Sequence, residues 1–390
     1  MKRIKSQILN KKILSKIPSP SFIIDESLLK KNLELMSAIQ LRTKCKILLA
    51  LKAFSMYSIF PKMRKYLSGV CASSLFEARL GYEEFQKEVH IFSPAYIEKE
   101  FDEIMKYCDH IVFNSFGQIK KYKNKIKNSK KKISAGIRIN PEYSEIKVDM
   151  YNPCVKYSRL GITLTELQKY ENEFDEFIEG IHFHTHCEQN VDSLERTLQV
   201  IEKKFDKYLR KVKWLNFGGG HHITREDYKT EKLCEIIEYF RDKYEVEIYL
   251  EPGEAIVLNT GFLLATVLDI FSNEKEIAIL DISAATHTPD VLEMPYRPYI
   301  IGSGEKNEYK YNYRLGGVSC LAGDVIGDYS FPKPLKIGDK LLFTDMAHYT
   351  MVKTNMFNGI NLPSIVLLTE KGEVKIIRKF KYEDYKMRLS

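Results

Sequence analysis

Lys52 is the residue whose setting in the sequence most directly suggests chemistry. It follows the apolar run 47–51, and a short run of this kind is typical of a parallel strand that is covered on both faces. Burial at the end of such a strand lowers the pKa of an ammonium group, and a neutral lysine can form a Schiff base. The alternative is a lysine that reaches solvent at the strand end. Neighbouring chemistry has to decide between the two interpretations.

Three consecutive glycines, Gly218, Gly219 and Gly220, directly follow another predicted strand. Backbone N–H groups without side-chain shielding bind phosphate, helped by the N-terminus of a following helix. Barrels of alternating strands and helices often bind phosphate after their seventh and eighth strands. A tight structural turn is the alternative, and at this position we favour phosphate binding.

Histidines and carboxylates supply further candidates. His182, His184 and His186 share one face of a strand through their period of two, so one of them can reach the strand end. Glu251 ends the next strand but one and can face a cationic ring nitrogen or pair with a lysine or arginine. A His-x-His pair with a carboxylate can also hold a metal ion, so a metal-dependent hydrolase is a competing interpretation.

These candidates fall at the ends of strands in a regular alternation. Eight strands are expected, at 47–53, 69–73, 89–93, 111–115, 133–140, 180–186, 214–217 and 248–251. Each gap between them holds one helical pattern, at 58–66, 75–85, 98–107, 116–127, 165–177, 193–209 and 229–244. Such alternation predicts a parallel sheet, and eight units of this length predict an α/β fold with a closed, TIM-like (β/α)8 barrel. Functional side chains in these barrels lie at the carboxyl ends of the strands, which is where the candidates fall.

Beyond residue 263 strands follow one another without helices, which predicts a C-terminal antiparallel β domain. We therefore divide the chain into an N-terminal segment 1–24 that joins the β domain, a barrel 25–263 and the β domain 264–390. The β domain adds Cys320 and Asp324 in a glycine-bounded loop. A cysteine there is exposed enough to react, or it is a small buried hydrophobe.

Composition excludes several classes of function. Hydrophobic residues make up 44% of the 390 residues, which is enough for a large core and excludes general disorder. The net charge of +8 comes from dispersed lysines, so we expect no nucleic-acid partner. Seven cysteines without C-x-x-C spacing argue against structural zinc and fit a reducing compartment. With no signal peptide or membrane-length apolar run, we expect a soluble, cytoplasmic protein with no metal and no membrane partner.

Several motifs follow one another in a characteristic order. They are 50–55 (ALKAFS), 72–81 (ASSLFEARLG), 181–185 (IHFHT), 216–222 (NFGGGHH), 251–255 (EPGEA), 289–298 (PDVLEMPYRP) and 320–324 (CLAGD). Over residues 21–357 this order resembles the alanine-racemase-fold (fold-type III) pyridoxal-phosphate-dependent decarboxylases, which include ornithine and diaminopimelate decarboxylases. Within that family the resemblance is to the carboxynorspermidine/carboxyspermidine decarboxylases.

The resemblance implies a pyridoxal 5'-phosphate cofactor and a role for each matching residue. Lys52 would bind the cofactor covalently, and His184 would stack on its ring. The three glycines and Tyr349 would contact its phosphate, and Glu251 would keep its pyridine nitrogen protonated. Cys320, as general acid, and Asp324 would reach the active site of a partner subunit, because such enzymes are homodimers with shared sites.

One departure from the family pattern points to the substrate. Ornithine-type enzymes place an arginine after Glu-Pro-Gly, and this chain has Glu254. A carboxylate there would repel phosphate, so we expect Glu254, Asp290 and Glu293 to face a cationic polyamine tail. The position usually held by a phosphate-binding serine is His186-Cys187, and the sequence suggests no role for His186.

The sequence therefore predicts a carboxy-lyase that converts carboxynorspermidine, carboxyspermidine or both into norspermidine or spermidine in polyamine biosynthesis. The alternatives are a diaminopimelate-type decarboxylase or amino-acid racemase of the same fold and, less favoured, the metal-dependent hydrolase. A non-catalytic basic binding protein has only dispersed lysines in its support. The sequence does not separate the two carboxypolyamines, because one methylene changes binding in an apolar pocket by only about 1–3 kcal/mol.

Overall fold

The computed structural model of the chain describes residues 6–390, which form two compact units. The barrel unit is Asn32–Ile256, and the sheet unit combines the chain up to Lys31 with Val257–Ser390. The predicted boundaries at 24/25 and 263/264 differ from these. The reason is that α2 (Glu26–Thr43) begins within the sheet unit and that the long strand β10 (Gly261–Asn273) starts before residue 264.

The barrel unit contains the predicted closed barrel of eight parallel strands, in the order β2 to β9. Each strand pairs with the next, and β2 pairs with β9 to close the ring. The strands are β2 (Lys46–Ala50), β3 (Gly69–Ala72), β4 (Glu88–Phe92), β5 (His110–Phe113), β6 (Ser134–Arg138), β7 (Gly180–His182), β8 (Trp214–Asn216) and β9 (Glu247–Leu250). All eight predicted strands are confirmed, although each ends one to four residues earlier than predicted.

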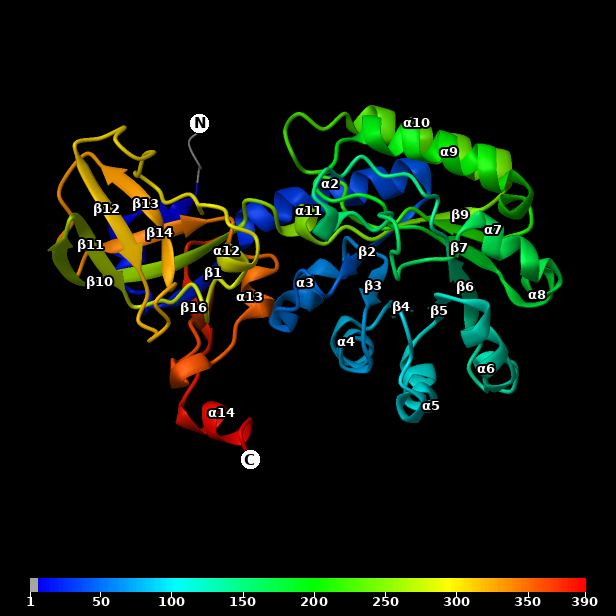
Figure 1. Cartoon of the computed structure of the whole chain (residues 1–390), viewed down its shortest axis with the longest axis horizontal. Helices are drawn as coiled ribbons and strands as arrows, with labels where there is room; N and C mark the ends of the chain where they lie inside the picture. The colour runs from blue at the N-terminus through cyan, green and yellow to red at the C-terminus, as the bar shows by residue number, and fades with distance from the viewer. Residues whose placement is uncertain (1–5) are drawn as a thin grey trace. The chain divides into compact units, whose positions relative to one another are not determined.

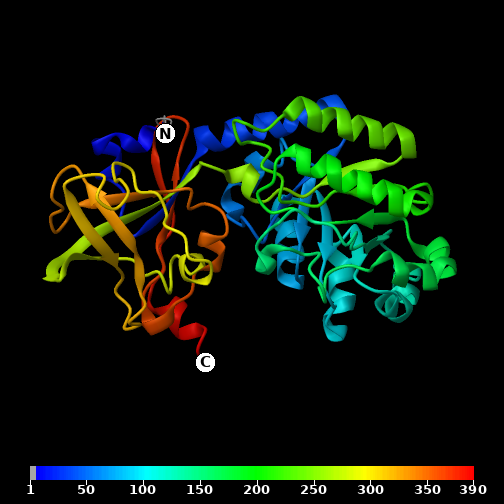
Figure 2. The ribbon, with the colours of Figure 1, turned by 45° about the horizontal axis from the view of Figure 1, so that its top comes forward.

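The helices of the barrel unit lie outside the ring of strands (Figures 1 and 2). They are α3 (Phe60–Met63), α4 (Leu75–Leu80), α5 (Glu98–Tyr107), α6 (Phe116–Lys127), α7 (Leu164–Leu167), α8 (Glu171–Phe177), α9 (Val191–Leu209), α10 (Thr230–Tyr244) and α11 (Glu254–Val257). The longest, α9, buries Leu194, Leu198, Ile201 and Phe205, and this spacing places them on one face of the helix. Burial of that face fixes the helix against the barrel.

The sheet unit holds a mixed sheet in the order β13-β12-β11-β10-β1-β15-β16, with β14 also pairing with β10. Its strands are β1 (Ser21–Asp25), β10, β11 (Lys275–Leu280), β12 (Tyr311–Gly316), β13 (Val325–Phe331), β14 (Lys340–Thr344), β15 (Ser364–Leu368) and β16 (Val374–Arg378). The prediction that the N-terminal strand joins this domain is confirmed, because β1 pairs with β10 and β15. Short helices complete the unit, at α1 (Lys11–Leu14), α12 (Asp290–Glu293), α13 (Thr350–Lys353) and α14 (Tyr382–Met387).

The expectation of a purely antiparallel sheet needs correction. The pairs β1–β15 and β11–β12 are parallel, and the other pairs are antiparallel. In this domain the sequence predicts strands at 266–271, 276–281, 309–316, 340–343 and 364–368, which leaves out β13 and β16. β16 is largely exposed at the sheet edge, so it lacks the alternation of apolar residues that marks a half-buried strand. Within residues 6–390 no helix combines the length and apolarity that a membrane crossing requires.

Candidate active site

Lys52 lies in the turn that follows β2, which ends two residues earlier. The turn is closed by the Ala53 N–H, which donates to the Ala50 carbonyl at 3.0 Å. The side chain of Lys52 is exposed, which agrees with the alternative of a lysine that reaches solvent at the strand end and not with a buried amine. Its charge nevertheless acts on His184 and on Glu251, which places the amine at the carboxyl end of the barrel, called the mouth below.

Glu251 follows β9 and is held by two neighbouring strand ends. Its carboxylate accepts from the Nδ2 of Asn216 at 2.8 Å and lies 3.1 Å from the Nε2 of His182. Burial lowers the pKa of His182, so the ring is neutral and carries its proton on the nitrogen that faces the carboxylate. Burial opposes the charge of Glu251, but these partners and Lys52 outweigh it, and its pKa lies below the ordinary value. The mouth thus holds a fixed, anionic acceptor.

His184 is half-buried, and its proton is also placed by a neighbour. Its Nδ1 accepts the N–H of Gly219 at 2.9 Å, so a neutral ring carries the proton on Nε2. Burial lowers the pKa of His184 well below its ordinary value, which keeps the ring neutral. Arg138, from the end of β6, donates to the His184 carbonyl at 3.1 Å. A flat, uncharged ring with a fixed orientation suits stacking against a planar cofactor.

The glycine loop after β8 needs glycine at each position, and two of its amides serve the protein itself. Gly218 and Gly220 have φ of +69° and +81°, and a Cβ on Gly219 would lie 2.4 Å from the Glu251 carbonyl. The Gly218 N–H donates to Asn216 at 2.8 Å and that of Gly219 to His184. Within residues 6–390 the Gly220 N–H has no such partner, so it is the glycine amide best placed to meet a phosphate.

His186, for which the sequence suggested no role, lies behind the glycine loop. It is buried, its Nδ1 is 2.9 Å from the hydroxyl of Thr185, and its ring stacks on that of His221 at 5.1 Å. A Cβ on Gly220 would lie 2.0 Å from the His186 carbonyl. We interpret His186 as packing that holds the loop.

Glu254 begins α11 at the mouth, next in the chain to Glu251 and Pro252-Gly253. Its carboxylate lies 3.1 Å from the Nε2 of His222, and the side chain is 17% exposed. Behind His222 lies Arg225, whose guanidinium is 3.2 Å from the other ring nitrogen. From the sequence, Asn216 and His222 were quoted only as parts of a motif and Arg138 stood only as a polar residue near a predicted strand end, while Arg225 was missed because nothing in its spacing marks it.

Five predicted site residues belong to the sheet unit, and two of them lie in the loop between β12 and β13. Cys320 is exposed, and its N–H donates to the Asn358 side chain at 2.9 Å. Asp324 is 5% exposed and accepts the N–H groups of Ala284 at 2.6 Å and Ser319 at 2.9 Å. The carboxylate of Asp324 therefore fastens this loop to its own sheet, and its predicted contact with substrate stays a prediction.

The other three lie on or next to short helices of the sheet unit. Asp290 accepts the hydroxyls of Tyr296 at 2.8 Å and Thr350 at 3.2 Å. Glu293 forms an ion pair with Lys353, and Tyr349, with φ of 48°, precedes α13. Their predicted roles also stay predictions.

The barrel and its mouth define a class of protein. A lysine, a neutral histidine and a buried anionic carboxylate surround a glycine loop at the carboxyl ends of the strands, and these groups fit pyridoxal phosphate. A family model described as "Pyridoxal-dependent decarboxylase, C-terminal sheet domain" matches residues 22–347. The chain belongs to the pyridoxal-dependent decarboxylases.

Individual relatives cover almost the whole chain. It is 45% identical over 384 residues to a carboxynorspermidine/carboxyspermidine decarboxylase of Campylobacter jejuni, covering 96% of this chain and 99% of the relative. It is 45% identical over 384 residues to a carboxyaminopropylagmatine decarboxylase of Synechocystis sp., covering 98% of each. Its fold matches the crystal structure of carboxynorspermidine decarboxylase complexed with norspermidine from C. jejuni, with TM-score 0.88, 44% identity and coverage of 95% and 100%.

These comparisons confirm the predicted family, the pyridoxal phosphate cofactor and the carboxy-lyase activity. They do not support the metal-dependent hydrolase. The geometry also does not favour a metal site at these two histidines. One ring nitrogen of His182 faces Glu251 and one of His184 accepts the N–H of Gly219, so each of these nitrogens already has a partner within the protein.

Proposed function

We propose that this enzyme decarboxylates a carboxypolyamine, carboxynorspermidine or carboxyspermidine, to norspermidine or spermidine in polyamine biosynthesis. The observation that carries the proposal is the 44% identity, over 95% of this chain, to a decarboxylase whose structure holds norspermidine. A polyamine tail carries several ammonium groups and favours carboxylates around it. Glu254 at the barrel mouth supplies one.

Four parts of the mouth would hold the cofactor. Lys52 would bind its aldehyde carbon, the amide of Gly220 its phosphate, and the ring of His184 its face. Glu251 would accept a hydrogen bond from the protonated pyridine nitrogen and so keep the proton there. When bound, pyridoxal phosphate supplies an electron sink for the charge that a departing carboxylate leaves behind. An anionic Glu251 would strengthen that sink, because it would keep the pyridine nitrogen protonated.

We assign the sheet-unit residues to a shared active site in a homodimer. Cys320 would protonate the reacting carbon in the partner's site, and Tyr349 would contact the phosphate. Support comes from the loop around Cys320, where Val318 and Leu321 are also exposed, at 39% and 44%. Exposed apolar side chains of this kind favour coverage by a second copy.

The remaining acidic residues, Asp290, Glu293 and Asp324, are proposed to surround the polyamine tail. The ion pair of Glu293 with Lys353 is exposed, so a substrate ammonium can replace the lysine at little cost. Asp324 is the least accessible of the three.

Mixing two inactive variants tests the shared site. Lys52→Ala and Cys320→Ala each disable one half of a shared site. After exchange of subunits in an equal mixture, half of the dimers contain both variants and one of their two sites is intact, so about a quarter of all sites should be active. Recovery of decarboxylation after mixing, measured against each variant alone, supports the assignment. Absence of recovery while native mass spectrometry shows heterodimers of the two variants would place the whole site in one chain.

A second candidate substrate is carboxyaminopropylagmatine, favoured by the 45% identity to the Synechocystis enzyme. Its tail ends in a guanidinium, which a carboxylate can bind through two parallel hydrogen bonds rather than one. The acidic mouth accommodates either cation, so only measurement separates them.

Side-by-side kinetics on four substrates test the proposal. Release of carbon dioxide from carboxynorspermidine, carboxyspermidine, carboxyaminopropylagmatine and diaminopimelate should give the highest kcat/KM for one of the first two. A higher value for carboxyaminopropylagmatine would select the second candidate. A preference for diaminopimelate would overturn both.

We also propose that the enzyme works in the cytoplasm. All seven cysteines, which lie within residues 6–390, are free thiols, as is usual in a reducing compartment. Fractionation of the source cells would test this.

A further inference from the structure

A chain of hydrogen bonds leads from the surface to Glu254. Asp227 binds Arg225 through two contacts, from Nε at 2.6 Å and from Nη2 at 3.1 Å. The Nη1 of Arg225 reaches the Nδ1 of His222 at 3.2 Å, and the Nε2 of His222 reaches Glu254 at 3.1 Å. At the outer end of this chain of hydrogen bonds, the side-chain amide of Asn190 also donates to Asp227 at 3.2 Å. Apart from Glu254, none of these residues has a role in the function proposed above.

The direction of every proton in this chain follows from chemistry. A guanidinium only donates hydrogen bonds, so the Nδ1 of His222 must accept from Arg225. The neutral ring then carries its single proton on Nε2 and donates it to the carboxylate of Glu254. Arg225 therefore selects the tautomer of His222 that holds Glu254. Without Arg225 the ring is free to take the other tautomer, which offers Glu254 a lone pair in place of a proton.

Backbone hydrogen bonds hold Arg225 and His222, called the relay below, in place. The N–H of Arg225 donates to the His222 carbonyl at 2.9 Å, which closes the turn between them. The N–H of His222 donates to the Gln189 carbonyl at 3.1 Å, and the Gln189 N–H donates to the Gly220 carbonyl at 2.9 Å. The loops after β7 and β8 are thus joined beneath the ring of His222, whose side chain is only 8% exposed. Its orientation is set by the same loop that carries the glycines.

The surroundings of Glu254 are acidic. A carboxylate oxygen of Glu188, a nitrogen of His222 and a carboxylate oxygen of Glu254 all lie within 4.8 Å of one another. Two carboxylates this close attract a cation, and a substrate ammonium bound here would meet both. A carboxylate that rotates freely would make weaker use of this charge, because ordering it on binding costs side-chain entropy.

We propose that His222 and Arg225 are positioning residues that set substrate specificity by fixing the carboxylate of Glu254 toward the ammonium groups of the polyamine tail. This inference rests on the proposed function, because it assigns Glu254 to that tail. The relay acts on recognition of the tail and leaves the reacting carbon untouched. Its loss should therefore appear in KM for a long cationic substrate and leave kcat nearly unchanged.

A double-mutant cycle with the cofactor-loaded enzyme and carboxynorspermidine tests the proposal. Glu254→Gln should raise KM about tenfold to a hundredfold, and Arg225→Leu and His222→Leu about threefold to tenfold, as expected for hydrogen bonds to charged groups. In the Glu254→Gln background the two relay substitutions should have no further effect on KM. His222→Gln keeps one donor and one acceptor and should recover part of the loss. The matched control is Arg210→Leu, which removes a similar arginine–aspartate contact on α9, with Asp206 at 2.9 and 3.1 Å, and should leave KM unchanged.

The outcomes separate this inference from the proposed function. If the wild-type enzyme does not turn over carboxypolyamines, the proposed function fails first. If it does, and Glu254→Gln raises KM but the relay variants do not, the positioning inference alone is wrong. Equal effects of the relay substitutions with and without Glu254 would likewise overturn it, because they would then act through the fold. Cofactor absorbance and thermal unfolding of each variant identify any that fail to fold, and His222→Gln keeps the cycle measurable in that case.

Discussion

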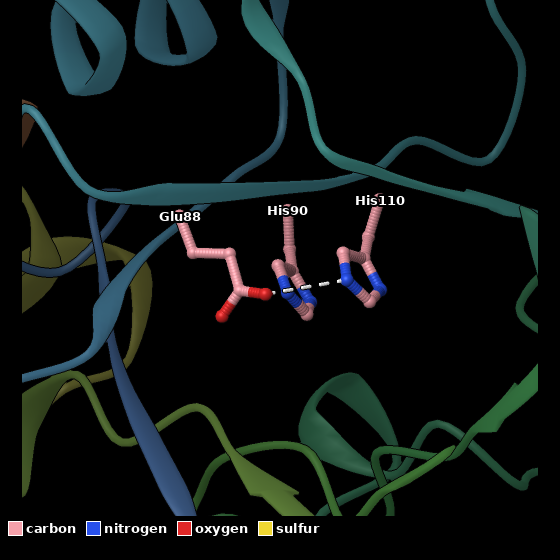
Figure 3. Close-up of side chains that lie close together, drawn as sticks. All are labelled: Glu88, His90 and His110. Carbon is pink, nitrogen blue, oxygen red and sulfur yellow. Dashed lines mark ion pairs between the residues drawn. The ribbon is translucent and has the colours of Figure 1, made fainter. Parts of the chain in front are cut away.

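The two ends of the barrel both pair histidines with glutamates, but they use the pairs differently. At the mouth, His182 faces Glu251 and His222 faces Glu254, each at 3.1 Å. At the other end, called the floor here, five of the eight strands begin with a charged or polar residue, and Glu88 at the start of β4 lies 3.4 Å from the Nε2 of His110. Figure 3 shows Glu88 beside the rings of His90 and His110.

The groups of the floor neutralise one another. The ammonium of Lys46 lies 3.2 Å from Glu88, which also accepts from the hydroxyl of Tyr249 at 3.2 Å. The rings of His90 and His110 stack at 3.9 Å and 11°. Glu88, His90 and His110 offer ligand atoms within 4.8 Å of one another. However, a cation in the plane of one ring would lie outside the plane of the other, and Lys46 would repel it.

The contrast teaches what separates a site from a polar core. At the mouth the carboxylates of both pairs belong to residues that we propose to contact the cofactor or the substrate. At the floor the carboxylate is shared among an ammonium, a hydroxyl and an imidazole, and the two nitrogens of His90 have no partner within residues 6–390. This agrees with the general division of these barrels, in which the carboxyl ends of strands carry function and the amino ends carry stability.

Removal of the Lys52 amine should have the largest effect. Lys52→Ala should lower kcat by about 10⁴-fold or more, because it takes away the group that we propose to bind the cofactor covalently. Borohydride reduction followed by peptide mapping should find the cofactor on Lys52 in the wild type and nowhere in the variant. Lys46→Ala at the floor is the control, and it should leave kcat within about twofold.

The same substitution at both ends tests the comparison directly. Glu251→Gln should lower kcat by about 10²- to 10³-fold, because a neutral amide no longer holds the proton on the pyridine nitrogen. Glu88→Gln should leave kcat nearly unchanged and lower the free energy of unfolding by about 1–2 kcal/mol, because it weakens the contacts with Lys46 and His110. Steady-state kinetics and urea unfolding of the two variants measure both quantities. A similar loss of kcat in each would break the distinction between mouth and floor.

The sequence predicts the barrel well because its strands are short, apolar and regularly spaced. The mouth residues follow from that regularity, since Lys52, His184 and Glu251 all stand where strands end. Strand β16 was missed because an exposed edge strand has no burial pattern to detect. The exposure of Lys52 matches the alternative that the sequence left open, because β2 ends at Ala50 and Lys52 lies in the turn that follows.

Partners set by tertiary contact could not be predicted from the sequence. Arg225 meets His222 across a turn, and His222 meets Glu254 across 32 residues. The use of the Gly218 and Gly219 amides by Asn216 and His184 depends equally on the folded loop. Residue type and spacing indicate that the glycine loop binds a phosphate, but only the fold decides which of its amides is left to contact that phosphate.

Acidification should destabilise the enzyme through its buried histidines at both ends. Burial lowers the pKa of His186 to about 4, of His221 to about 3, and of His90 well below its ordinary value of 6.5. These rings are neutral when folded and take up protons when unfolded, so stability is full above pH 6.5 and falls as the pH drops toward the folded-state pKa values. Each such histidine contributes about 1.4 kcal/mol per pH unit in that window. Urea unfolding between pH 8 and pH 5 measures the slope, and a flat profile below pH 6.5 would contradict the burial of these rings.

The smallest effect is expected at the floor, where His90 and His110 form a matched pair of stacked rings. His110 has a partner in Glu88, and His90 has none within residues 6–390. A buried polar group without a partner destabilises the folded state, so an apolar side chain of similar size in place of His90 removes that cost. His90→Leu should therefore change the free energy of unfolding at neutral pH by less than about 1 kcal/mol, with the small loss of packing offset by the relief. His110→Leu should destabilise by about 1–2 kcal/mol more than His90→Leu, because it leaves Glu88 with one partner fewer. If the two variants are equally unstable in urea, the stacking of the rings, and not the pairing with Glu88, holds the floor together.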